Sequence, residues 1–450
     1  MKDKYQDLYR RLVNAYYNRN FEEVFEHMLK TEFENKEEAR EILSALCGVE
    51  NDVNKDDYIF TQVIIDSITK GRVREKIVQK VHKCTEDCEQ SDGKSKCQSV
   101  CPFDAIIRAE DGVDKTIDPM LCMSCGRCVT ACDRGNYLET PQFLPLANLL
   151  DEDEKVVAIV APAIAGQFGE NISLDQLREA FIKVGFSDMV EVAMAADILS
   201  FKEALEFNEH VKEKGDVMIT SCCCPMWVSM LRKVYHQFIK DVSPSVSPMI
   251  AMGRVLKALN PDVKIVFISP CVAKKAEAKE PDLVGTIDFV VTFQEMKMIF
   301  DLLHIEPAKL KGVPSVDYAA TGGRLYARTG GVSEAVFDVV DELFPESRKL
   351  FTSMSVDGVP DCKRTLNELT EGKIRASFIE GMGCKGGCVG GPKTNVDEEK
   401  GKEAVNRVAY ESAIKNPLNS EILNDLLHKI GVEDIYDLKD GNSMFERHFE

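Results

Sequence analysis

The run Gly381-Met382-Gly383-Cys384-Lys385-Gly386-Gly387-Cys388-Val389-Gly390-Gly391-Pro392 sets two cysteines four residues apart among six glycines. It follows a largely apolar segment, residues 374–379, that we expect to form a buried strand. Glycine allows the backbone to approach a bulky group and to adopt positive φ without a Cβ clash. Thiolates are soft ligands that select zinc, copper(I) or iron–sulfur clusters. Because a glycine-rich turn can be only a turn, the metal interpretation depends on whether other strands also end in cysteine.

Two further predicted strands end in cysteine. One runs into Thr220-Ser221-Cys222-Cys223-Cys224-Pro225-Met226-Trp227, and the other into Ser269-Pro270-Cys271-Val272-Ala273-Lys274-Lys275-Ala276-Glu277. From about residue 145, apolar runs rich in β-branched residues alternate with helical stretches, which predicts an α/β fold with parallel sheets flanked by helices. The runs are residues 156–160, 217–220, 265–269, 289–293 and 374–379. Ligands of such sheets gather at the carboxyl ends of strands, so the cysteine-bearing segments should converge in a buried pocket.

Composition and charge exclude several classes of protein. The 450 residues are 44% hydrophobic and suffice for two or three domains with a sizeable core. A formal net charge of −19 argues against nucleic acid or an anionic membrane as a partner. The N-terminus has no signal-peptide pattern, and the longest apolar run, residues 156–166, is too short to span a bilayer. We therefore expect a soluble, cytoplasmic protein with reduced thiols, in which isolated Cys47 and Cys362 are buried apolar residues.

Eight cysteines between residues 84 and 132 have the spacing of metal ligands. The runs are Cys84-x3-Cys88-x8-Cys97-x3-Cys101-Pro102 and Cys122-x2-Cys125-x2-Cys128-x3-Cys132. The second is the bacterial ferredoxin run, with Asp133 where proline usually follows, and in two-cluster ferredoxins the fourth cysteine of each run ligates the other cluster. The predicted ligands of one [4Fe–4S] cluster are Cys84, Cys88, Cys97 and Cys132, and those of the second are Cys101, Cys122, Cys125 and Cys128.

A polar insertion at residues 89–96 departs from the usual ferredoxin spacing in the first run. Two structural zinc sites are the alternative for these eight cysteines. The spacing disfavours zinc, because all-cysteine zinc sites usually come as separated Cys-x2-Cys pairs.

The first 80 residues are predicted to be helical. Apolar residues at positions 21, 24, 25, 28 and 29 follow the spacing of one helix face. Residues 70–83 carry six basic residues against one acidic residue. They are interpreted as a solvated helix face, with a docking patch for an acidic redox carrier as the alternative.

The three cysteine-bearing segments and the ferredoxin-like run resemble the iron-only or [FeFe] hydrogenases over roughly residues 80–430. Three consecutive cysteines, Met226 and Ser269 are similar to the group B branch of that family. The resemblance implies a two-lobed α/β domain that holds an H-cluster, a [4Fe–4S] cube bridged through one cysteine to a two-iron unit with carbonyl, cyanide and dithiolate ligands. The predicted domains are a helical accessory segment (1–80), a ferredoxin-like domain (81–144) and the catalytic domain (145–450).

The resemblance also implies roles for residues of the pocket. The implied ligands of the cube are Cys224, Cys271, Cys384 and Cys388, with Cys388 bridging to the two-iron unit. Cys223 matches the proton-shuttling thiol, and Cys222 falls where the family usually has serine. A shift of the alignment by one residue would exchange the roles of ligand and proton shuttle among these cysteines. Lys274 matches the lysine that hydrogen-bonds a cyanide, a charge-assisted bond. Pro162 and Met382 match residues that line the pocket.

A proton path is implied by Glu203, Glu206 and Ser243, which match the family's relay. The two glutamates lie three residues apart on one face of a helix predicted at 199–213. Periodicity alone would favour solvated helix charges, and only the resemblance favours the relay, which runs from Cys223 through Glu203, Ser243 and Glu206 to solvent. The family often has arginine at the outer mouth, where His210 would make proton exit sensitive to pH.

Two departures near the two-iron unit concern polarity. Ser269 replaces a methionine and Met249 replaces a glutamine of the family pattern, and such changes around a cluster tune its potential. The predicted function is reversible reduction of protons to dihydrogen, with electrons from ferredoxin or a similar carrier through two [4Fe–4S] clusters, after maturation factors install the two-iron unit. The alternatives are a non-catalytic iron–sulfur assembly or carrier protein, a hydrogen sensor, and an electron-transfer module.

Overall fold

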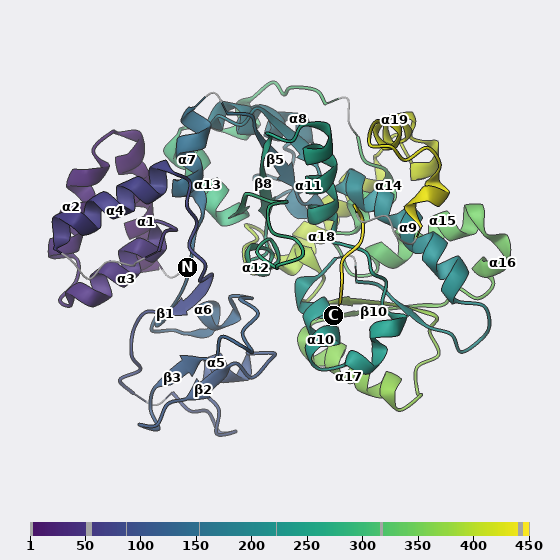
Figure 1. Cartoon of the computed structure of the whole chain (residues 1–450), viewed down its shortest axis with the longest axis horizontal. Helices are drawn as coiled ribbons and strands as arrows, with labels where there is room; N and C mark the ends of the chain where they lie inside the picture. Colours follow the sequence, from purple (N-terminus) through teal and green to yellow (C-terminus); the bar gives the residue numbers. More distant parts are fainter. Residues whose placement is uncertain are drawn as a thin grey trace. The chain divides into compact units, whose positions relative to one another are not determined.

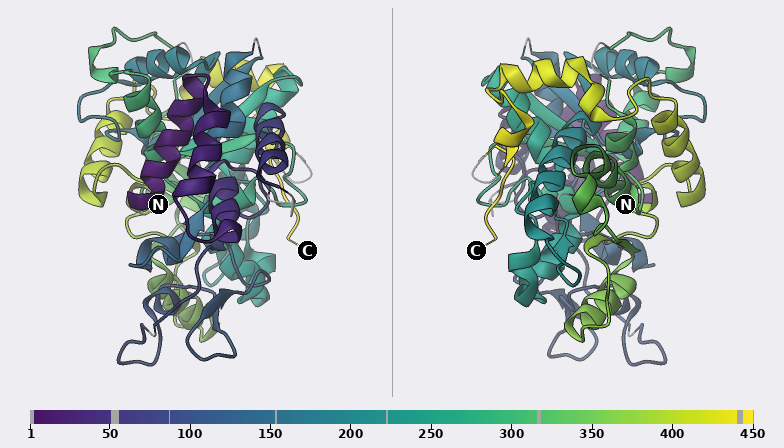
Figure 2. Two further views of the ribbon diagram at one scale, coloured as in Figure 1. Left: turned by 90° about the vertical axis from the view of Figure 1, so that its left-hand side faces the viewer. Right: turned by 90° about the vertical axis from the view of Figure 1, so that its right-hand side faces the viewer.

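The computed structural model describes residues 3–50, 56–86, 88–152, 154–221, 223–315, 318–439 and 444–449, so Cys222 lies outside the described residues. The chain divides into two compact units, Met1–Glu154 with Asp301–Leu303 and Lys155–Phe300 with His304–Glu450. Figure 1 gives the labels of the helices and strands, and Figure 2 shows the same ribbon from two further directions.

The first unit begins with helices. They are α1 (Asp3–Tyr17), α2 (Phe21–Thr31), α3 (Lys36–Leu46) and α4 (Asp57–Thr69), and α7 (Phe143–Asp151) belongs to the same unit. Phe25, Met28 and Leu29 are buried on one face of α2, as their spacing requires. The side chains of Asn35 and Asp56 cap α3 and α4 by accepting backbone N–H groups of the first turn.

The basic stretch at residues 70–83 is not a helix face, and that interpretation is wrong. Helix α4 ends at Thr69, and the chain turns at Gly71, which has a φ of +61°. Arg74 is 2% exposed and pairs with Glu41. Lys80, in strand β1 (Val78–Lys80), pairs with Asp114. These two cations are therefore neutralised within the unit, which weakens the stretch as a docking patch for an acidic carrier.

Short elements carry the eight cysteines of residues 84–132, hereafter the eight-cysteine region. Strand β1 pairs antiparallel with β4 (Tyr137–Glu139), and β2 (Ile106–Arg108) pairs antiparallel with β3 (Lys115–Ile117). The helices of this region are α5 (Lys96–Ser99) and α6 (Arg127–Ala131).

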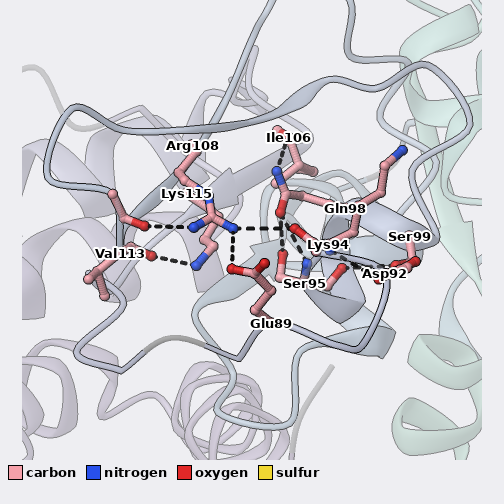
Figure 3. A network of polar contacts seen from close by, with 12 residues as sticks. Glu89, Asp92, Lys94, Ser95, Gln98, Ser99, Ile106, Arg108, Val113 and Lys115 are labelled. Atoms are coloured by element: carbon pink, nitrogen blue, oxygen red, sulfur yellow. Dashed lines mark hydrogen bonds and ion pairs between the residues drawn. The ribbon is translucent and has the colours of Figure 1, made fainter.

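The polar insertion at residues 89–96 is a folded loop with its own contacts (Figure 3). Arg108 of β2 donates to Oε2 of Glu89 at 2.8 Å and to the carbonyl of Gly112 at 3.1 Å. Ser95 starts α5 with a capping box, in which Gln98 Oε1 accepts from the Ser95 backbone N–H at 3.1 Å. The insertion is therefore tied to β2 and to α5, which carries Cys97.

Two parallel sheets form the framework of the second unit. The first has the order β6-β5-β8-β9, with β5 (Val156–Val160), β6 (Asp188–Glu191), β8 (Lys264–Ser269) and β9 (Phe289–Thr292). The second has the order β10-β11-β7, with β7 (Met218–Ile219), β10 (Ser353–Asp357) and β11 (Phe378–Met382). The prediction of an α/β fold with parallel sheets is confirmed. Most side chains of β5, β8, β9 and β11 are buried, as expected for parallel strands covered by helices.

In the second unit, one predicted strand is displaced and two strands were missed. The strand expected at 374–379 begins only at Phe378 and continues to Met382. Gly381 lies within this central strand, and the position requires glycine because the ring of Trp227 packs where a Cβ would stand. Strands β6 and β10 escaped prediction because both are edge strands that carry acidic and other polar residues.

Helices connect and flank these sheets (Figure 1). Between residues 162 and 259 they are η1 (Pro162–Ile164), α8 (Leu174–Val184), α9 (Ala193–His210), α10 (Pro225–Lys233), η2 (His236–Asp241) and α11 (Pro248–Leu259). From residue 273 to 348 they are α12 (Ala273–Glu277), α13 (Phe293–Leu302), η3 (Pro307–Lys309), α14 (Thr321–Leu325), α15 (Gly331–Leu343) and α16 (Pro345–Arg348). The remainder are α17 (Val359–Thr370), η4 (Cys388–Gly390), α18 (Glu398–Tyr410), η5 (Pro417–Asn419), α19 (Glu421–Lys429) and η6 (Ile435–Leu438). Within the described ranges, none of the helices combines the length and the apolarity needed to cross a bilayer.

Candidate active site

Four cysteines of the second unit meet beyond the carboxyl ends of three strands. Cys224 follows β7, Cys271 follows β8, and Cys384 and Cys388 follow β11. Burial raises the pKa of Cys271 well above its ordinary value, and the thiols of the other three cysteines raise it further. Since a thiolate is disfavoured by neighbouring negative charge, this dependence places the four sulfurs near one another. We call Cys224, Cys271, Cys384 and Cys388 the four-cysteine site.

Glycines close tightly around the four-cysteine site. The backbone N–H of Gly383 donates to Sγ of Cys224 at 3.3 Å, and a Cβ on this glycine would lie 2.7 Å from Cβ of Met226. Gly387 has a φ of +90°, and its Cβ would lie 2.8 Å from the amide nitrogen of Thr329. A side chain at either position would force its neighbours apart, so close approach requires glycine there.

Lys274 and Cys223 accompany Cys388. Lys274 is 7% exposed, and its Nζ lies 2.6 Å from Oε2 of Glu277 in an ion pair that lacks hydrogen-bond alignment. Burial disfavours the ammonium, but Glu277 and nearby thiols, that of Cys223 foremost, outweigh burial and raise the pKa of Lys274. The pKa of Cys388 is raised first by a hydrogen bond with Cys223 and second by burial. A buried ammonium and a fifth thiol therefore lie beside one member of the four-cysteine site.

The donor set fits an iron–sulfur cluster better than a single metal ion. Across the described part of the chain, no three His, Cys, Asp or Glu side chains are arranged to hold one ion. A [4Fe–4S] cube takes each thiolate on a different iron, so its four ligands stand farther apart than the ligands of one zinc ion. The glycines leave room for a bulky group, and the ammonium of Lys274 can donate to an anionic ligand. These residues fit a cube with an anionic group beside Cys388.

Two glutamates of α9 are buried, so the alternative that they are solvated helix charges is wrong. Glu203 is fully buried and accepts a hydrogen bond from Oγ1 of Thr220 at 2.7 Å. Glu206 is 8% exposed, and its Oε2 accepts a hydrogen bond from Oγ of Ser243 at 2.6 Å. The structure therefore brings together Glu206 and Ser243 of the predicted relay, and it sets Glu203 beside the residue that follows β7.

A cavity of about 200 Å³ lies at the outer end of this acidic pair. Glu206 and Ser243 line it together with His210 and Asp241. The His210 side chain is 41% exposed, and its Nε2 lies 3.6 Å from Oδ1 of Asp241. The predicted position of His210 near the mouth of the path agrees with this placement.

The remaining residues predicted for the pocket lie at the ends of strands and helices. Pro162 begins η1 directly after β5, and Met249 is buried in the first turn of α11. Met382 ends β11, and Ser269 ends β8. Oγ of Ser269 accepts a hydrogen bond from the backbone N–H of Cys271 at 3.3 Å, which ties it to the four-cysteine site. The roles of Pro162, Met249 and Met382 beside a two-iron unit stay predictions.

The eight-cysteine region forms two neighbourhoods of thiols. Burial raises the pKa of Cys88, and the thiols of Cys97, Cys84 and Cys132 raise it further. Burial also raises the pKa of Cys125 to about 11, with further contributions from Cys101 and Cys122. Burial raises the pKa of Cys128 as well, and its neighbours are Cys125, Cys122 and Cys101 together with Cys97 of the other predicted set. The division of the eight thiols into the two ligand sets expected from the ferredoxin spacing stays a prediction.

Backbone amides also donate to sulfurs of this region. The N–H of Ala105 lies 3.2 Å from Sγ of Cys101, and the N–H of Asn136 lies 3.4 Å from Sγ of Cys132. Such bonds stabilise thiolates and tune the potential of iron–sulfur clusters.

Sequence reasoning missed three charged residues of the second unit. Lys202 pairs with Glu206 four residues along α9, and Glu277 pairs with Lys274 three residues along α12. Both spacings are visible in the sequence and could have been found. Glu446 pairs with Lys202 from near the C-terminus, and no local pattern announces a contact of that range.

Comparisons with known proteins agree with this arrangement. Residues 154–392 match the family described as iron only hydrogenase large subunit, C-terminal domain. The fold is similar to a solved [FeFe]-hydrogenase from work on its oxygen inactivation, with a TM-score of 0.57 at 21% identity over 68% of this chain and 98% of that one. A structure of apo [FeFe]-hydrogenase HydA1 from Chlamydomonas reinhardtii gives 0.55 at 21% identity, over 66% of this chain and 94% of that one. The chain belongs to the iron-only hydrogenase large-subunit family.

The curated relatives include hydrogenases and iron–sulfur cluster assembly factors. Iron hydrogenase 1 of Clostridium pasteurianum is 27% identical over 367 residues, which are 61% of this chain and 64% of that protein. The NADP-reducing hydrogenase subunit HndD of Solidesulfovibrio fructosivorans is 27% identical over 326 residues, or 60% of this chain and 55% of that protein. The chain thus spans less than two thirds of either hydrogenase. A probable cytosolic Fe–S cluster assembly factor of Drosophila erecta is 23% identical over 414 residues, or 77% and 82% of the two chains.

Proposed function

We propose that this protein is an [FeFe] hydrogenase that catalyses the reversible reduction of protons to dihydrogen and resembles the group B branch. The observation that carries the proposal is the surroundings of Cys388. A second thiol, Cys223, and the buried ammonium of Lys274 lie beside it in a site of four converging thiols. An iron–sulfur carrier needs the four thiols but has no use for the other two groups.

The residues of the pocket then have separate tasks. The four-cysteine site would hold the cube of an H-cluster, and Cys388 would be the cysteine shared with a two-iron unit that maturation factors install. When bound, this cofactor supplies the chemistry that joins two protons and two electrons. Lys274 orients an anionic cyanide by a charge-assisted hydrogen bond. Cys223 holds a proton at Sγ next to Cys388, with which it forms a hydrogen bond, and Cys224 is the proposed ligand of the cube.

Protons reach Cys223 from solvent through the acidic residues of α9. The contact between Ser243 Oγ and Glu206 Oε2 supports the outer part of this path, and the burial of Glu203 supports the inner part. Burial excludes bulk water, so a proton has to move between fixed side-chain oxygens. Ordinary helix charges would face solvent instead.

Electrons enter through the eight-cysteine region, which we propose to be a ferredoxin-like domain at residues 81–144 with two [4Fe–4S] clusters. The grouping of its thiols into two sets supports two clusters. A ferredoxin or similar redox carrier is the proposed electron donor, and residues 145–450 are the proposed catalytic domain.

A second candidate function is iron–sulfur cluster assembly without hydrogen chemistry. The alignment with the Drosophila erecta assembly factor favours it, because that alignment covers larger shares of both chains than the alignments with HndD and iron hydrogenase 1. The buried Glu206–Ser243 contact and the buried Lys274 oppose it, since cluster transfer needs neither.

One measurement separates the two candidates. After the two-iron unit has been installed, the protein should show infrared bands of metal-bound carbonyl and cyanide and should evolve hydrogen from reduced viologen. Cys223→Ser should keep the infrared bands but lose about 100-fold or more of proton-limited turnover, the range for loss of a positioned proton donor. Matured protein without bands from diatomic ligands would refute the hydrogenase, and unchanged turnover of Cys223→Ser would refute the relay.

A further inference from the structure

A buried lysine lies against the outer glutamate of the proposed proton path. Lys202 of α9 is fully buried, and its Nζ forms an ion pair with Oε1 of Glu206. The other oxygen of that carboxylate, Oε2, accepts the hydrogen bond from Ser243. Nζ of Lys202 also lies 3.0 Å from Oε1 of Glu446. Burial disfavours the ammonium, but Glu206 and Glu446 outweigh burial and raise the pKa of Lys202, so it stays charged.

Glu446 reaches this position because the C-terminal segment, residues 444–449, lies along the residues that follow Ser243. The carbonyl of Phe445 accepts from the N–H of Val246 at 2.9 Å, and the N–H of Arg447 donates to the carbonyl of Pro244 at 2.9 Å. Phe445 is fully buried, and Figure 2 shows the segment as an extended trace that ends at the C-terminus. The segment is therefore docked on the second unit by backbone pairing and by an apolar anchor.

Two arginines hold the same segment on the second unit. Nη1 of Arg254, on α11, donates to the carbonyl of Glu446 at 2.8 Å, and the Arg447 guanidinium pairs with Glu280. Glu446 is thus fixed in place by its backbone, which leaves its carboxylate directed to Lys202.

We propose that Lys202 and Glu446 are positioning residues of the proton exit. Lys202 keeps Glu206 as a carboxylate aimed at Ser243, and the negative charge of Glu446 weakens the stabilising effect of the Lys202 ammonium on that carboxylate. The inference rests on the proposed function, because it assigns Glu206 to a proton path. An ammonium shared between two carboxylates stabilises each of them less than an ammonium that pairs with one.

Other charged groups lie on the elements near Glu206, and the substitutions of Lys202 and Glu446 should leave their ion pairs unchanged. Those on α9 are Glu203, Glu209 and His210, those on η2 are Lys240 and Asp241, and Lys439 follows η6. His210 faces Asp241, and Lys439 pairs with Glu209. Lys202 forms an ion pair with Glu206, whereas Lys439 pairs with Glu209.

The test is an infrared titration of the Glu206 carboxyl group in the matured full chain, with the band assigned by its loss in Glu206→Gln. Lys202→Met should move the titration midpoint of Glu206 upward by about 1–3 pH units, the usual effect of removing an opposite charge at close range. Glu446→Gln should move it downward, because Lys202 then pairs with Glu206 alone. Lys439→Met is the matched control and should leave the midpoint unchanged, because that lysine pairs with Glu209.

The pH profile of hydrogen turnover should shift in the same direction as the midpoint in each variant. Unchanged midpoints in both variants, or shifts in the same direction, would overturn the inference, since general disturbance of the fold does not produce opposite signs. Lys202→Arg should restore the wild-type midpoint if charge alone matters. Opposite shifts of the midpoint without a shift of the turnover profile would support the charge arrangement and refute the proton path of the proposed function.

Discussion

The two groups of cysteines in this protein are built in opposite ways. The eight-cysteine region draws its thiols from 49 consecutive residues, on loops and on the short helices α5 and α6, and its Cys88 is exposed. The four-cysteine site draws its thiols from residues 224 to 388, beyond the strands of two sheets, and burial dominates the pKa of Cys224 and Cys271 there. Short-range spacing suffices to gather the first set of thiols. The second set comes together only through a folded framework of two sheets.

The largest expected effect separates the two groups by function. If the proposed function holds, Cys271→Ala removes one thiol of the four-cysteine site and should abolish hydrogen evolution together with the infrared bands of diatomic ligands. Cys88→Ala removes one thiol of the eight-cysteine region and should abolish only electron delivery from a ferredoxin-type carrier. The hydrogen–deuterium exchange that needs only the active cluster and its proton path should remain.

Electron paramagnetic resonance of the same samples counts the remaining clusters. The signals of the eight-cysteine region should persist in Cys271→Ala and should change in Cys88→Ala. If Cys88→Ala also lost the exchange reaction, the two groups of cysteines would not be independent in the way their construction indicates.

A second prediction concerns the glycines, which differ between the two groups. A Cβ on Gly381 would collide with the ring of Trp227, whereas a Cβ on Gly112, in the eight-cysteine region, would have no atom within 4 Å. Gly381→Ala should therefore destabilise the second unit by up to about 3 kcal/mol, the upper range for overpacking. Trp227 is the single tryptophan of the chain, so its fluorescence in a urea titration reports this unit directly.

Gly372→Ala is the control within the second unit. This glycine has a φ of +68° and no atom within 4 Å of a Cβ, so alanine there incurs backbone strain of about 1–2 kcal/mol without any collision. If the midpoint of the urea transition followed by Trp227 fluorescence shifted equally in both variants, the collision of a Cβ at residue 381 with Trp227 would have to be relieved by small movements, and the prediction would be wrong.

Sequence patterns predict the local features of both regions but not the contacts between residues far apart in the chain. The β-branched runs predict β5, β8 and β9 because those strands are buried on both faces, and the cysteine spacing predicts which thiols lie together. Strands β6 and β10 carry polar residues at the edges of their sheets, so no apolar run marks them. Strand β11 continues past residue 379 to Met382 and includes Gly381, which sequence reasoning assigned to a turn although it packs against Trp227.

The candidate site divides in the same way. The convergence of three strand ends follows from the general placement of ligands in parallel sheets. The contact between Glu206 and Ser243 was expected only through the family resemblance, because an exposed and a buried glutamate have the same spacing on a helix. The pairing of Lys202 with Glu446 depends on how the C-terminal segment docks, which is a tertiary contact that no local pattern encodes.

The smallest expected effect concerns how one cysteine of each group is held. The backbone N–H of Cys84 donates to Oδ1 of Asp114 at 2.7 Å, whereas that of Cys271 donates to the neutral hydroxyl of Ser269. Burial opposes the charge of Asp114, but the N–H of Cys84 and the ammonium of Lys80 outweigh burial and lower its pKa to about 2. The folded-state pKa is thus below the ordinary value of 3.8, so the contribution of this carboxylate to stability is complete above that value and is lost as the pH falls through about 2.

Asp114→Asn should lower the stability of the first unit by about 1–2 kcal/mol at neutral pH, which corresponds to a lowering of the pKa by one to two units with allowance for solvent. Amide hydrogen exchange measures this locally. The protection factor of the Cys84 amide should fall in the variant at neutral pH, and in the wild-type protein it should fall as the pH drops from about 4 toward 2. The protection of the Cys271 amide should follow neither change, because a hydroxyl acceptor does not titrate in this range. If both amides lost protection together on acidification, global unfolding rather than Asp114 would govern the acid sensitivity of the eight-cysteine region.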